Sequence, residues 1–409
     1  MNSWHNDILA RAGQHRRVAR SIRICNQQGQ PLRRHPLQLS GKSDFAIGSC
    51  VGRSLLGSDI DGERQRSLVR AHFPLLVCEN AMKWYATEAK DGEEDYQLAD
   101  QLLDWSEKQG HDLRGHCLFW EKEKFQTDWV KKLSKDQLWK RLCLRLESIL
   151  NRYRGRVCDW DMLNEMLDGD FFASRLGTDG RAAMFRQAHA IDPTIRLFTN
   201  EYGILDSDQR TEQYRRLIDD LRAQGAPIGG IGIQEHAAER FVINEGEAAL
   251  EADRPERQGR GPLIPDEIWR RLDFLAETGL PIHFTEISIA TADKPRAARA
   301  MDLLLGTAFA HPAVECCLFW GFEARNHWLG DAAALVDRAG RPFPAMLSLS
   351  EWQRQWSQQE NLVSDDQGCI EISAWQGNYT LSDQTGQVAK LSLKGPQDEM
   401  VHEVVFKQL

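Results

Sequence analysis

The sequence contains no apolar run long enough to cross a membrane, and its start, MNSWHNDILARAGQHRRVARSIR, lacks the apolar stretch of a signal peptide. We therefore expect a cytoplasmic protein with no membrane segment, or a secreted one if a leader precedes this sequence. An excess of positive charge is absent too, because 51 Lys and Arg stand against 60 Asp and Glu, a net charge of −9. This balance argues against nucleic acid or an anionic membrane as the main partner.

Cysteine does not occur in the pattern of a disulfide framework. The nine cysteines are an odd number, and six stand inside apolar runs, which favours buried free thiols. These six are Cys50, Cys78, Cys117, Cys158, Cys316 and Cys317.

Three catalytic signatures are missing as well: a Gly-rich nucleotide-binding loop, a Ser–His–Asp grouping, and the tight His and carboxylate spacing of a closed metal site. We therefore expect neither a cofactor nor a metal.

Eight short apolar runs lie between residues 45 and 322 of this 409-residue chain. They are FAIGSCVG, FPLLVCEN, LRGHCLFW, VCDWDMLNE, IRLFTNEY, IGGIGIQEH, PIHFTEISI and VECCLFWGF. Each has the length of a buried parallel strand, and helix-like stretches with charged faces separate them. Eight strands that alternate with helices predict a (β/α)8 TIM barrel. A doubly wound sheet is the alternative, but no Gly-rich phosphate loop follows the first run.

The predicted barrel occupies residues 44–358, between two smaller parts. Residues 1–43 are expected to form a helix and a β-hairpin, because two short strand-like stretches flank a Gly turn. Residues 359–409 alternate apolar and polar side chains, which predicts a small antiparallel β extension. A structural role is expected for it, and carbohydrate binding through Trp375 and Tyr379 is the alternative. The charged stretch 251–265 is expected to form a surface excursion.

Polar and aromatic side chains stand where seven of the eight runs end. They are Glu79 and Asn80, His116 and Trp120, Asn164 and Glu165, Asn200 and Tyr202, Gln234 and His236, Glu286, and Trp320. The C-terminal ends of barrel strands converge on one face, where active sites are built. A single polar strand end is equally well explained by a strand that ends at the solvent-exposed surface. Seven polar strand ends together predict a single pocket.

Two of these side chains, Glu165 and Glu286, end the fourth and seventh runs and so belong on opposite sides of the pocket mouth. Two carboxyl groups in this arrangement can flank a glycosidic bond, one protonated to donate to the leaving oxygen and one ionised to attack the sugar. The alternatives are a structural ion pair and a metal site, and the spacing disfavours the metal. The chain also has 13 Trp, whose faces stack on sugars; core packing accounts for roughly half of them.

Six motifs, in this order, resemble those of glycoside hydrolase family 10, the endo-1,4-β-xylanase family. CENAMKW is similar to its E-N-x-M-K-W, GHCLFW to its G-H-x-L-x-W, and WDMLNE to its W-D-V-V-N-E. IGIQEH is similar to its G-I-G-I-Q-x-H, FTEIS to its T-E-(L/V)-D, and FWGFEARNHWL to its W-G-x(6)-W-L. The match covers nearly the whole stretch from Phe45 to Trp356, and its pattern is closest to the plant and animal branch.

The resemblance implies a retaining hydrolysis in which Glu165 is the acid/base and Glu286 is the nucleophile. It also implies that Glu79, Asn80 and Lys83 hold the sugar one place beyond the cleaved one, on the non-reducing side. Further contacts are implied for His116, Trp120, Asn164, Gln234 and His236 around the attacked sugar, for Trp320 and Trp328 on sugar faces, and for Tyr202 on the aglycone side.

Three features depart from the family pattern. Ser288 stands where the resemblance expects Asp, which bears on the tuning of the nucleophile. The stretch EKEKFQTDW after Trp120 has no match for the glutamine that helps to select xylose, which weakens the expectation of strict xylan specificity. Glu235 occupies a place where small residues are usual.

We therefore expect a monomeric retaining β-glycanase that hydrolyses internal β-1,4-xylosidic bonds of xylan or xylo-oligosaccharides. Two alternatives stay open. One is an intracellular exo-type or aryl β-glycosidase acting on short oligosaccharides, and the other is a barrel that binds carbohydrate without catalysis. The presence of both glutamates favours an enzyme.

Overall fold

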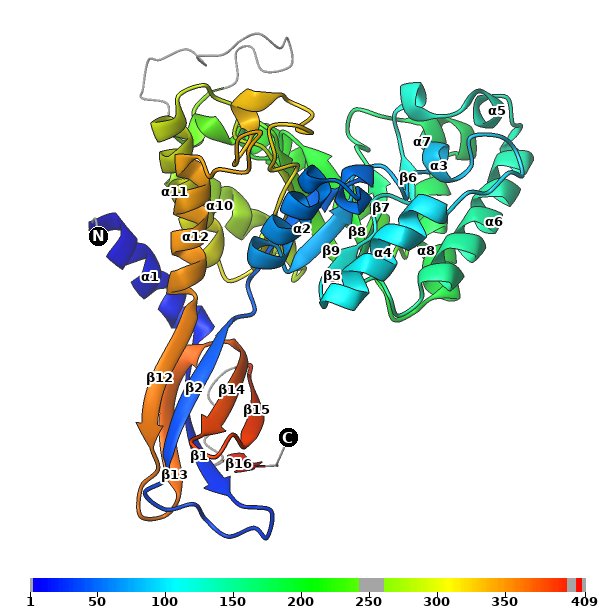
Figure 1. Cartoon of the computed structure of the whole chain (residues 1–409). Coiled ribbons are helices and arrows are strands. Elements are labelled where there is room, and N and C mark those ends of the chain that lie inside the picture. The colour runs from blue at the N-terminus through cyan, green and yellow to red at the C-terminus, as the bar shows by residue number, and fades with distance from the viewer. Residues whose placement is uncertain (1–2, 243–260, 396–401, 407–409) are drawn as a thin grey trace. The chain divides into compact units, whose positions relative to one another are not determined.

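The structure is a computed structural model that describes residues 3–242, 261–395 and 402–406 (Figure 1). Contacts divide the chain into two compact units. One unit comprises Met1–Ala46, Leu305–Glu315 and Ser348–Leu409, and the other comprises Ile47–Leu304 and Cys316–Leu347. The N-terminal and C-terminal parts that the sequence predicts separately thus fall in the same unit. Most of the expected surface excursion at 251–265 lies outside the described residues.

The larger unit is built on one curled parallel sheet. Its strands are β3 (Ala46–Val51), β4 (Leu75–Cys78), β5 (Asp112–Arg114), β6 (Phe119–Trp120), β7 (Asp159–Asn164), β8 (Arg196–Tyr202), β9 (Gly230–Glu235), β10 (Ile282–Ile287) and β11 (Val314–Phe319). They pair in the order β5-β4-β3-β11-β10-β9-β8-β7-β6. The two ends of this order, β5 and β6, are halves of the third predicted run, which is interrupted at the cis peptide bond His116–Cys117.

The interrupted third strand closes the barrel. Leu113 O accepts a hydrogen bond from Cys158 N at 2.9 Å, and Gly115 N donates to Asp159 O at 2.8 Å, so this stretch pairs with β7. Its other neighbour is β4, which pairs with β5. Each of the eight predicted runs therefore contributes one strand position, and the predicted (β/α)8 barrel is confirmed.

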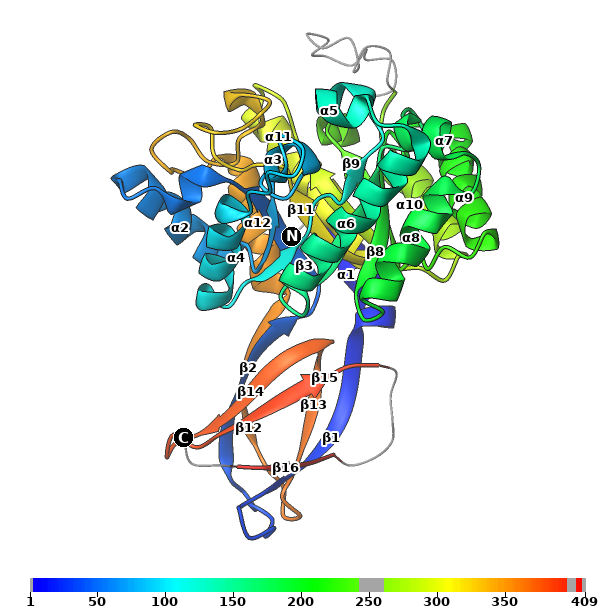
Figure 2. The ribbon, with the colours of Figure 1, turned by 90° about the vertical axis from the view of Figure 1, so that its right-hand side faces the viewer.

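Helices follow the strands, and Figure 2 shows α4, α6 and α8 on the outside of the sheet. The helices of the described chain are α1 (Ser3–Arg16), α2 (Ile60–His72), α3 (Trp84–Thr87), α4 (Gln97–Gln109), α5 (Asp128–Lys131), α6 (Lys135–Tyr153), α7 (Phe171–Leu176), α8 (Gly180–Ile191), α9 (Asp208–Ala223), α10 (Pro265–Ala276), α11 (Lys294–Ala310) and α12 (Pro344–Gln355). Short 3-10 turns are η1 (Arg53–Leu56), η2 (Glu123–Phe125), η3 (Ala238–Val242) and η5 (Asp331–Ala333).

Local sequence explains where these helices begin and end. At the start of α6, Ser134 and Gln137 form a capping box, in which each side chain bonds the other residue's backbone N–H. The residues that α6 buries include Leu138, Leu142 and Leu146, at helical spacing. Gly110 ends α4 in the left-handed conformation with φ 77°, as expected for a helix C-terminus.

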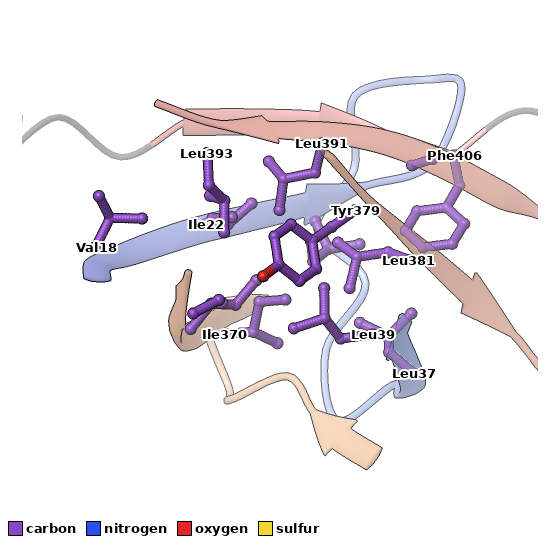
Figure 3. Close-up of a cluster of buried hydrophobic side chains, with 14 residues drawn as sticks. Val18, Ile22, Leu37, Leu39, Ile370, Tyr379, Leu381, Leu391, Leu393 and Phe406 are labelled. Atoms are coloured by element: carbon purple, nitrogen blue, oxygen red, sulfur yellow. The ribbon is translucent and has the colours of Figure 1, made fainter. Parts of the chain in front are cut away.

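The smaller unit carries two β-sheets around a shared apolar core. One sheet has the order β13-β1-β16 and the other the order β12-β2-β14-β15. Their strands are β1 (Arg17–Cys25), β2 (Pro36–Ser43), β12 (Ser357–Val363), β13 (Cys369–Trp375), β14 (Gly377–Asp383), β15 (Val388–Leu393) and β16 (His402–Val405). Figure 3 shows the ring of Tyr379 inside this core, with Leu39 and Leu391 beside it.

The prediction of a β-hairpin within residues 1–43 is wrong. β1 pairs with β13 and β16, whereas β2 pairs with β12 and β14, so the two strands lie in different sheets. Both strands alternate buried and exposed residues, and each has one apolar face. In a hairpin these faces would lie side by side in one sheet, whereas two sheets let apolar faces bury each other. The antiparallel extension expected in the tail is present, but it completes these two sheets.

Two smaller expectations are also settled by burial. Trp375 and Tyr379 are buried, so neither ring is exposed for stacking on a sugar, and a structural role is favoured. Of the six cysteines expected to be buried free thiols, five are buried, but Cys158 is exposed at the start of the fourth strand run. All nine cysteines are free thiols. No helix of the described residues combines the length and apolar character that a membrane crossing requires.

Candidate active site

A cavity of about 880 Å³ lies at the C-terminal ends of the barrel strands, and of the strand-end residues that the sequence predicts, all except Asn200 line it, together with Lys83 and Trp328. These residues are Glu79, Asn80, Lys83, His116, Trp120, Asn164, Glu165, Tyr202, Gln234, His236, Glu286, Trp320 and Trp328. They come from seven strand positions and from the loop after β11, so the predicted convergence on one pocket is found.

Glu286 is buried at the end of β10 and is surrounded by donors and positive charge. Asn200 Nδ2 donates to its Oε1 at 2.9 Å, and His236 Nε2 lies 3.3 Å from its Oε2. His116 Nε2 lies 3.9 Å from Oε1. Burial alone would raise the pKa of this carboxyl group, but the bond to His236 and the charges of His116 and Lys83 outweigh burial and lower the pKa. Glu286 is therefore ready to act as an anion.

Glu165 has the opposite electrostatic setting. Its side chain is only 13% exposed, and burial raises the pKa of its carboxyl group. The negative charge of Glu286 adds to this rise, whereas the indole of Trp120 and the charge of Lys122 oppose it. Lys122 Nζ lies 4.0 Å from Glu165 Oε2. Glu165 and Glu286 are thus tuned in opposite directions: Glu165 toward keeping its proton and Glu286 toward losing it.

The backbone places both carboxyl groups in irregular positions. Glu165 has φ 59°, in the left-handed region, which costs roughly 1–3 kcal/mol for a residue other than glycine. A hydrogen bond from Glu165 N to Asn200 O, 2.9 Å long, holds this conformation. The pairing register shifts between Asp161 and Leu163 in β7 and between Phe284 and Glu286 in β10. Such bulges re-aim side chains beside active sites.

A chain of amides connects the pocket wall to Glu286. Gln234 Nε2 and Asn200 Nδ2 both donate to Asn164 Oδ1, at 3.0 and 2.9 Å. Asn200 also accepts from Thr285 Oγ1 at 2.5 Å. These bonds set the orientation of the Asn164 amide, whose NH2 group is left to face the pocket.

The imidazole of His116 is held in place by the buried carboxyl group of Asp161. Asp161 Oδ2 lies 2.9 Å from His116 Nδ1, and Arg114 Nη2 donates to Asp161 Oδ1 at 2.5 Å. Burial would raise the pKa of Asp161, but the charge of Arg114 and the contact with His116 lower it to about 2. The contact with Asp161 fixes the orientation of the His116 ring, so that Nε2 is the ring nitrogen nearer to Glu286.

Aromatic rings form the walls of the pocket. The ring centroids of His116 and Trp320 are 4.9 Å apart, and those of His236 and Trp328 are 4.8 Å apart. Lys83 Nζ lies 4.7 Å from the Trp120 ring centroid and donates to Asn80 Oδ1 at 3.1 Å. Trp328 is 43% exposed and offers a large apolar face to the opening.

Comparison with known proteins identifies the family. The sequence model described as Glycosyl hydrolase family 10 matches residues 37–351. The chain belongs to this family. Endo-1,4-beta-xylanase 3 of Arabidopsis thaliana is 34% identical over 347 residues, which are 83% of this chain and 42% of that protein. Endo-1,4-beta-xylanase 1 of the same plant is 34% identical over 348 residues, 83% of this chain and 33% of that protein. The chain thus spans less than half of the length of these relatives.

A solved structure supports the fold. Xylanase 10B from Thermotoga petrophila, crystallised with xylobiose, superposes with a TM-score of 0.65 at 22% identity, covering 76% of this chain and 94% of that chain. The family that the six motifs predict is therefore confirmed, and so is the barrel.

The three departures from the glycosyl hydrolase family 10 pattern have structural counterparts. Ser288 Oγ lies 3.2 Å from His236 Nδ1, so the serine faces the histidine that contacts Glu286. Glu235 is fully buried beside Arg240, whose Nη2 lies 3.0 Å from its carboxyl oxygens, and it is absent from the pocket lining. The stretch after Trp120 brings Lys122, a cation, into the pocket.

Several lining residues were missed by sequence reasoning. They are Lys122, Lys124, Phe125, Asp168, Gly203, Asp206, Ser207 and Arg210. All of them follow the third, fourth or fifth strand, but Lys124 and Phe125 lie in η2 and Arg210 lies in the first turn of α9, whereas the others lie in loops. The signal that would have found them is position alone, because loops after barrel strands build the active-site face. Lys122 is tied into the site by donating to Asp168 O at 2.9 Å and to Tyr202 Oη at 3.2 Å.

Proposed function

We propose that this chain is a retaining β-glycanase that hydrolyses internal β-1,4-xylosidic bonds of xylan or xylo-oligosaccharides. The observation that carries the proposal is the opposite tuning of two carboxyl groups in one pocket: the pKa of Glu165 is raised and that of Glu286 is lowered. A protonated and an ionised carboxyl group beside one substrate are what double displacement requires.

In the first step, the ionised Glu286 attacks the anomeric carbon while Glu165 gives its proton to the glycosidic oxygen. The bond from carbon to this oxygen breaks, and the aglycone leaves as an alcohol. In the second step, Glu165, now ionised, takes a proton from water, whose oxygen attacks the same carbon and displaces Glu286. One water is consumed for each bond that is cleaved, and both glutamates return to their starting states.

The surroundings of Glu286 support its role as nucleophile. Asn200 donates to one of its carboxyl oxygens, and His236 lies within bonding distance of the other. These contacts keep the carboxylate oriented and ionised before the substrate arrives, which is electrostatic preorganisation.

The shape of the pocket supports an endo-acting enzyme. Glu79 and Lys83 line it on the β4 side of the two carboxyl groups, and Tyr202 and Lys122 line it on the other side. Sugars can therefore be held on both sides of the cleaved bond, whereas an exo-type enzyme needs one side closed. The polar lining and the exposed Trp328 suit a neutral polysaccharide.

Product analysis tests this proposal against its two alternatives. The protein is incubated with xylan, with linear xylo-oligosaccharides and with mixed-linkage glucan, and the products are followed over time beside a Glu286→Gln control. An endo-xylanase releases oligosaccharides of intermediate length from xylan early in the reaction. Release of single sugars alone indicates the exo-type enzyme, and binding without products indicates a carbohydrate-binding barrel. A monomeric state and a cytoplasmic location stay predictions.

A further inference from the structure

Glu235 and Arg240 form an ion pair that is buried beside the active-site cavity. Glu235 is the last residue of β9 and is 0% exposed, whereas Arg240 lies in η3 and is 3% exposed. Arg240 Nη2 lies 3.0 Å from each carboxyl oxygen of Glu235 and 2.7 Å from Asp206 Oδ1. Burial alone would lower the pKa of the Arg240 guanidinium, but the charges of Glu235 and Asp206 outweigh burial and raise the pKa. A charged pair is costly to bury, so its other bonds indicate what it holds.

A two-residue excursion of the chain follows β9. Ser288 N donates a hydrogen bond to Glu235 O, and Ala238 N donates one to Ser288 O, each 3.0 Å long. His236 and Ala237 bulge out between these two attachment points, as in a β-bulge. The position of the His236 backbone therefore depends on what holds the excursion itself.

The ion pair holds this excursion by its backbone. Ala237 N donates to Glu235 Oε1 at 2.9 Å, and Arg240 Nε donates to Ala237 O at 3.1 Å. Both backbone polar groups of the residue after His236 are thus bonded to the pair, and the two members of the pair are bonded to each other. A side chain without an acceptor at position 235 would leave Ala237 N without this bond.

The excursion matters because His236 is a neighbour of the nucleophile. His236 Nε2 lies 3.3 Å from Glu286 Oε2. Burial raises the pKa of Glu286, and the contact with His236 is the largest of the effects that lower it. On the other side of the imidazole, Ser288 Oγ lies 3.2 Å from Nδ1 and contributes one neutral hydrogen bond to the orientation of the ring. The contact with Glu286 therefore depends on the backbone that carries His236.

We propose that Glu235 and Arg240 are a buried positioning pair, which fixes the backbone beside His236 and so holds the imidazole against Glu286. Neither member of the pair lines the cavity, so both act through His236. This inference rests on the proposed function, in which Glu286 must be ionised to attack the sugar. It also gives a role to Glu235, which stands where small residues are usual in the family.

The pH profile of kcat/KM on an aryl β-xylobioside tests this inference, because its acid limb reports the ionisation of the nucleophile. Glu235→Leu removes the acceptor that holds Ala237 N. A displaced His236 lowers the pKa of Glu286 less, so the acid limb should move to higher pH by about 0.5–1 unit, as expected when a hydrogen bond to a charged group is weakened. Glu235→Gln keeps an oxygen that can accept from Ala237 N and should leave the limb in place.

The direction of this shift separates positioning from a direct effect of charge. Removing the negative charge of Glu235 would by itself lower the pKa of Glu286 and move the acid limb to lower pH. The other ionisable groups that interact with Glu286 are the same in all these variants; they are His116, Lys83, Glu79, Glu165, Cys50 and Cys117. An upward shift therefore reports the loss of the contact with His236.

Two further variants keep the test independent of folding. Glu235→Leu combined with Arg240→Met replaces the whole pair by apolar side chains and leaves neither member as an unmatched buried charge. This double variant should move the acid limb as far as Glu235→Leu does. Glu88→Gln is the matched control, because Glu88 is also buried and paired with an arginine, Arg141, but lies outside the cavity lining. It should leave the limb unchanged.

A His236→Ala background shows whether the pair acts through the imidazole. Glu235→Leu should cause no further shift of the acid limb there, because the contact with Glu286 is already lost. A shift that persists in this background overturns the proposal. So does an acid limb that stays in place or moves to lower pH in Glu235→Leu and in the double variant. Absence of aryl release by the wild-type protein contradicts the proposed function instead.

Discussion

Glu201 lies fully buried in β8, directly after Asn200, and its two carboxyl oxygens differ in their surroundings. Oε1 accepts a hydrogen bond from Leu167 N, 2.8 Å long, in the loop that follows Glu165. Oε2 has no hydrogen-bond partner in the described part of the chain. Burial raises the pKa of this carboxyl group from 4.5 to about 8, and the nearby charge of Glu165 adds to the rise.

This shift has a calculable effect on stability. Below pH 4.5 the folded and unfolded states both hold the proton, so Glu201 favours neither state. Between pH 4.5 and pH 8 the unfolded state releases the proton and the folded state keeps it, so the free energy of unfolding falls by about 1.4 kcal/mol per pH unit. The loss is about 3 kcal/mol at pH 7 and reaches about 5 kcal/mol above pH 8.

Glu201→Gln removes the titration and keeps an oxygen to accept from Leu167. The variant is expected to gain stability over the wild type as pH rises, by about 3–4 kcal/mol between pH 5 and pH 8. Urea unfolding followed by tryptophan fluorescence at pH 5, 6, 7 and 8 measures this difference. Glu212→Gln is the matched control, because Glu212 is in an exposed ion pair with Arg216. Its replacement should change the free energy of unfolding by less than about 1 kcal/mol. A difference that stays constant from pH 5 to pH 8 would refute a protonated Glu201.

Two further predictions concern the pH dependence of kcat/KM. Lys122→Met removes a positive charge 4.0 Å from Glu165 Oε2, so Glu165 should keep its proton to higher pH and the basic limb should move upward; a shift to lower pH contradicts this role. Ser288→Asp replaces an oxygen 3.2 Å from His236 Nδ1 by a carboxylate, which favours the charged imidazole and should also move the basic limb to higher pH. If that limb does not move, Ser288 is a neutral replacement.

The barrel was predictable from sequence because its strands are short and buried on both faces. In VCDWDMLNE, every residue of β7 is buried, and the run contains neither glycine nor proline. The strands of the smaller unit were also recognisable, since β1 and β2 alternate clearly. Their partners were not predictable, because alternation specifies which face is buried and not which strand pairs with it. The hairpin expectation failed for this reason.

The candidate site likewise has a part that was predictable from sequence and a part that was not. Residues at strand ends, such as Glu79 and Gln234, were predicted because the barrel brings strand ends together whatever the loops do. Lys122 and Arg210 were missed because they lie beyond the strand ends, in a loop and in the first turn of α9, where the path of the chain depends on contacts such as the ion pair between Arg210 and Asp168. The left-handed backbone of Glu165 also gave no signal, since no glycine or asparagine marks that position.

The division of roles between the two glutamates is tested most directly by rescue with azide. Glu165→Ala and Glu286→Ala are each given an aryl β-xylobioside with a good leaving group, in the presence of azide, and the configuration of the glycosyl azide is read by NMR. Glu165→Ala should still form the covalent intermediate on Glu286, because a good leaving group needs no proton, and azide should then displace Glu286 to give the β-azide. Glu286→Ala cannot form that intermediate and should give only the α-azide or no product. An α-azide from Glu165→Ala, or a β-azide from Glu286→Ala, would contradict the assignment of Glu165 as acid/base and Glu286 as nucleophile.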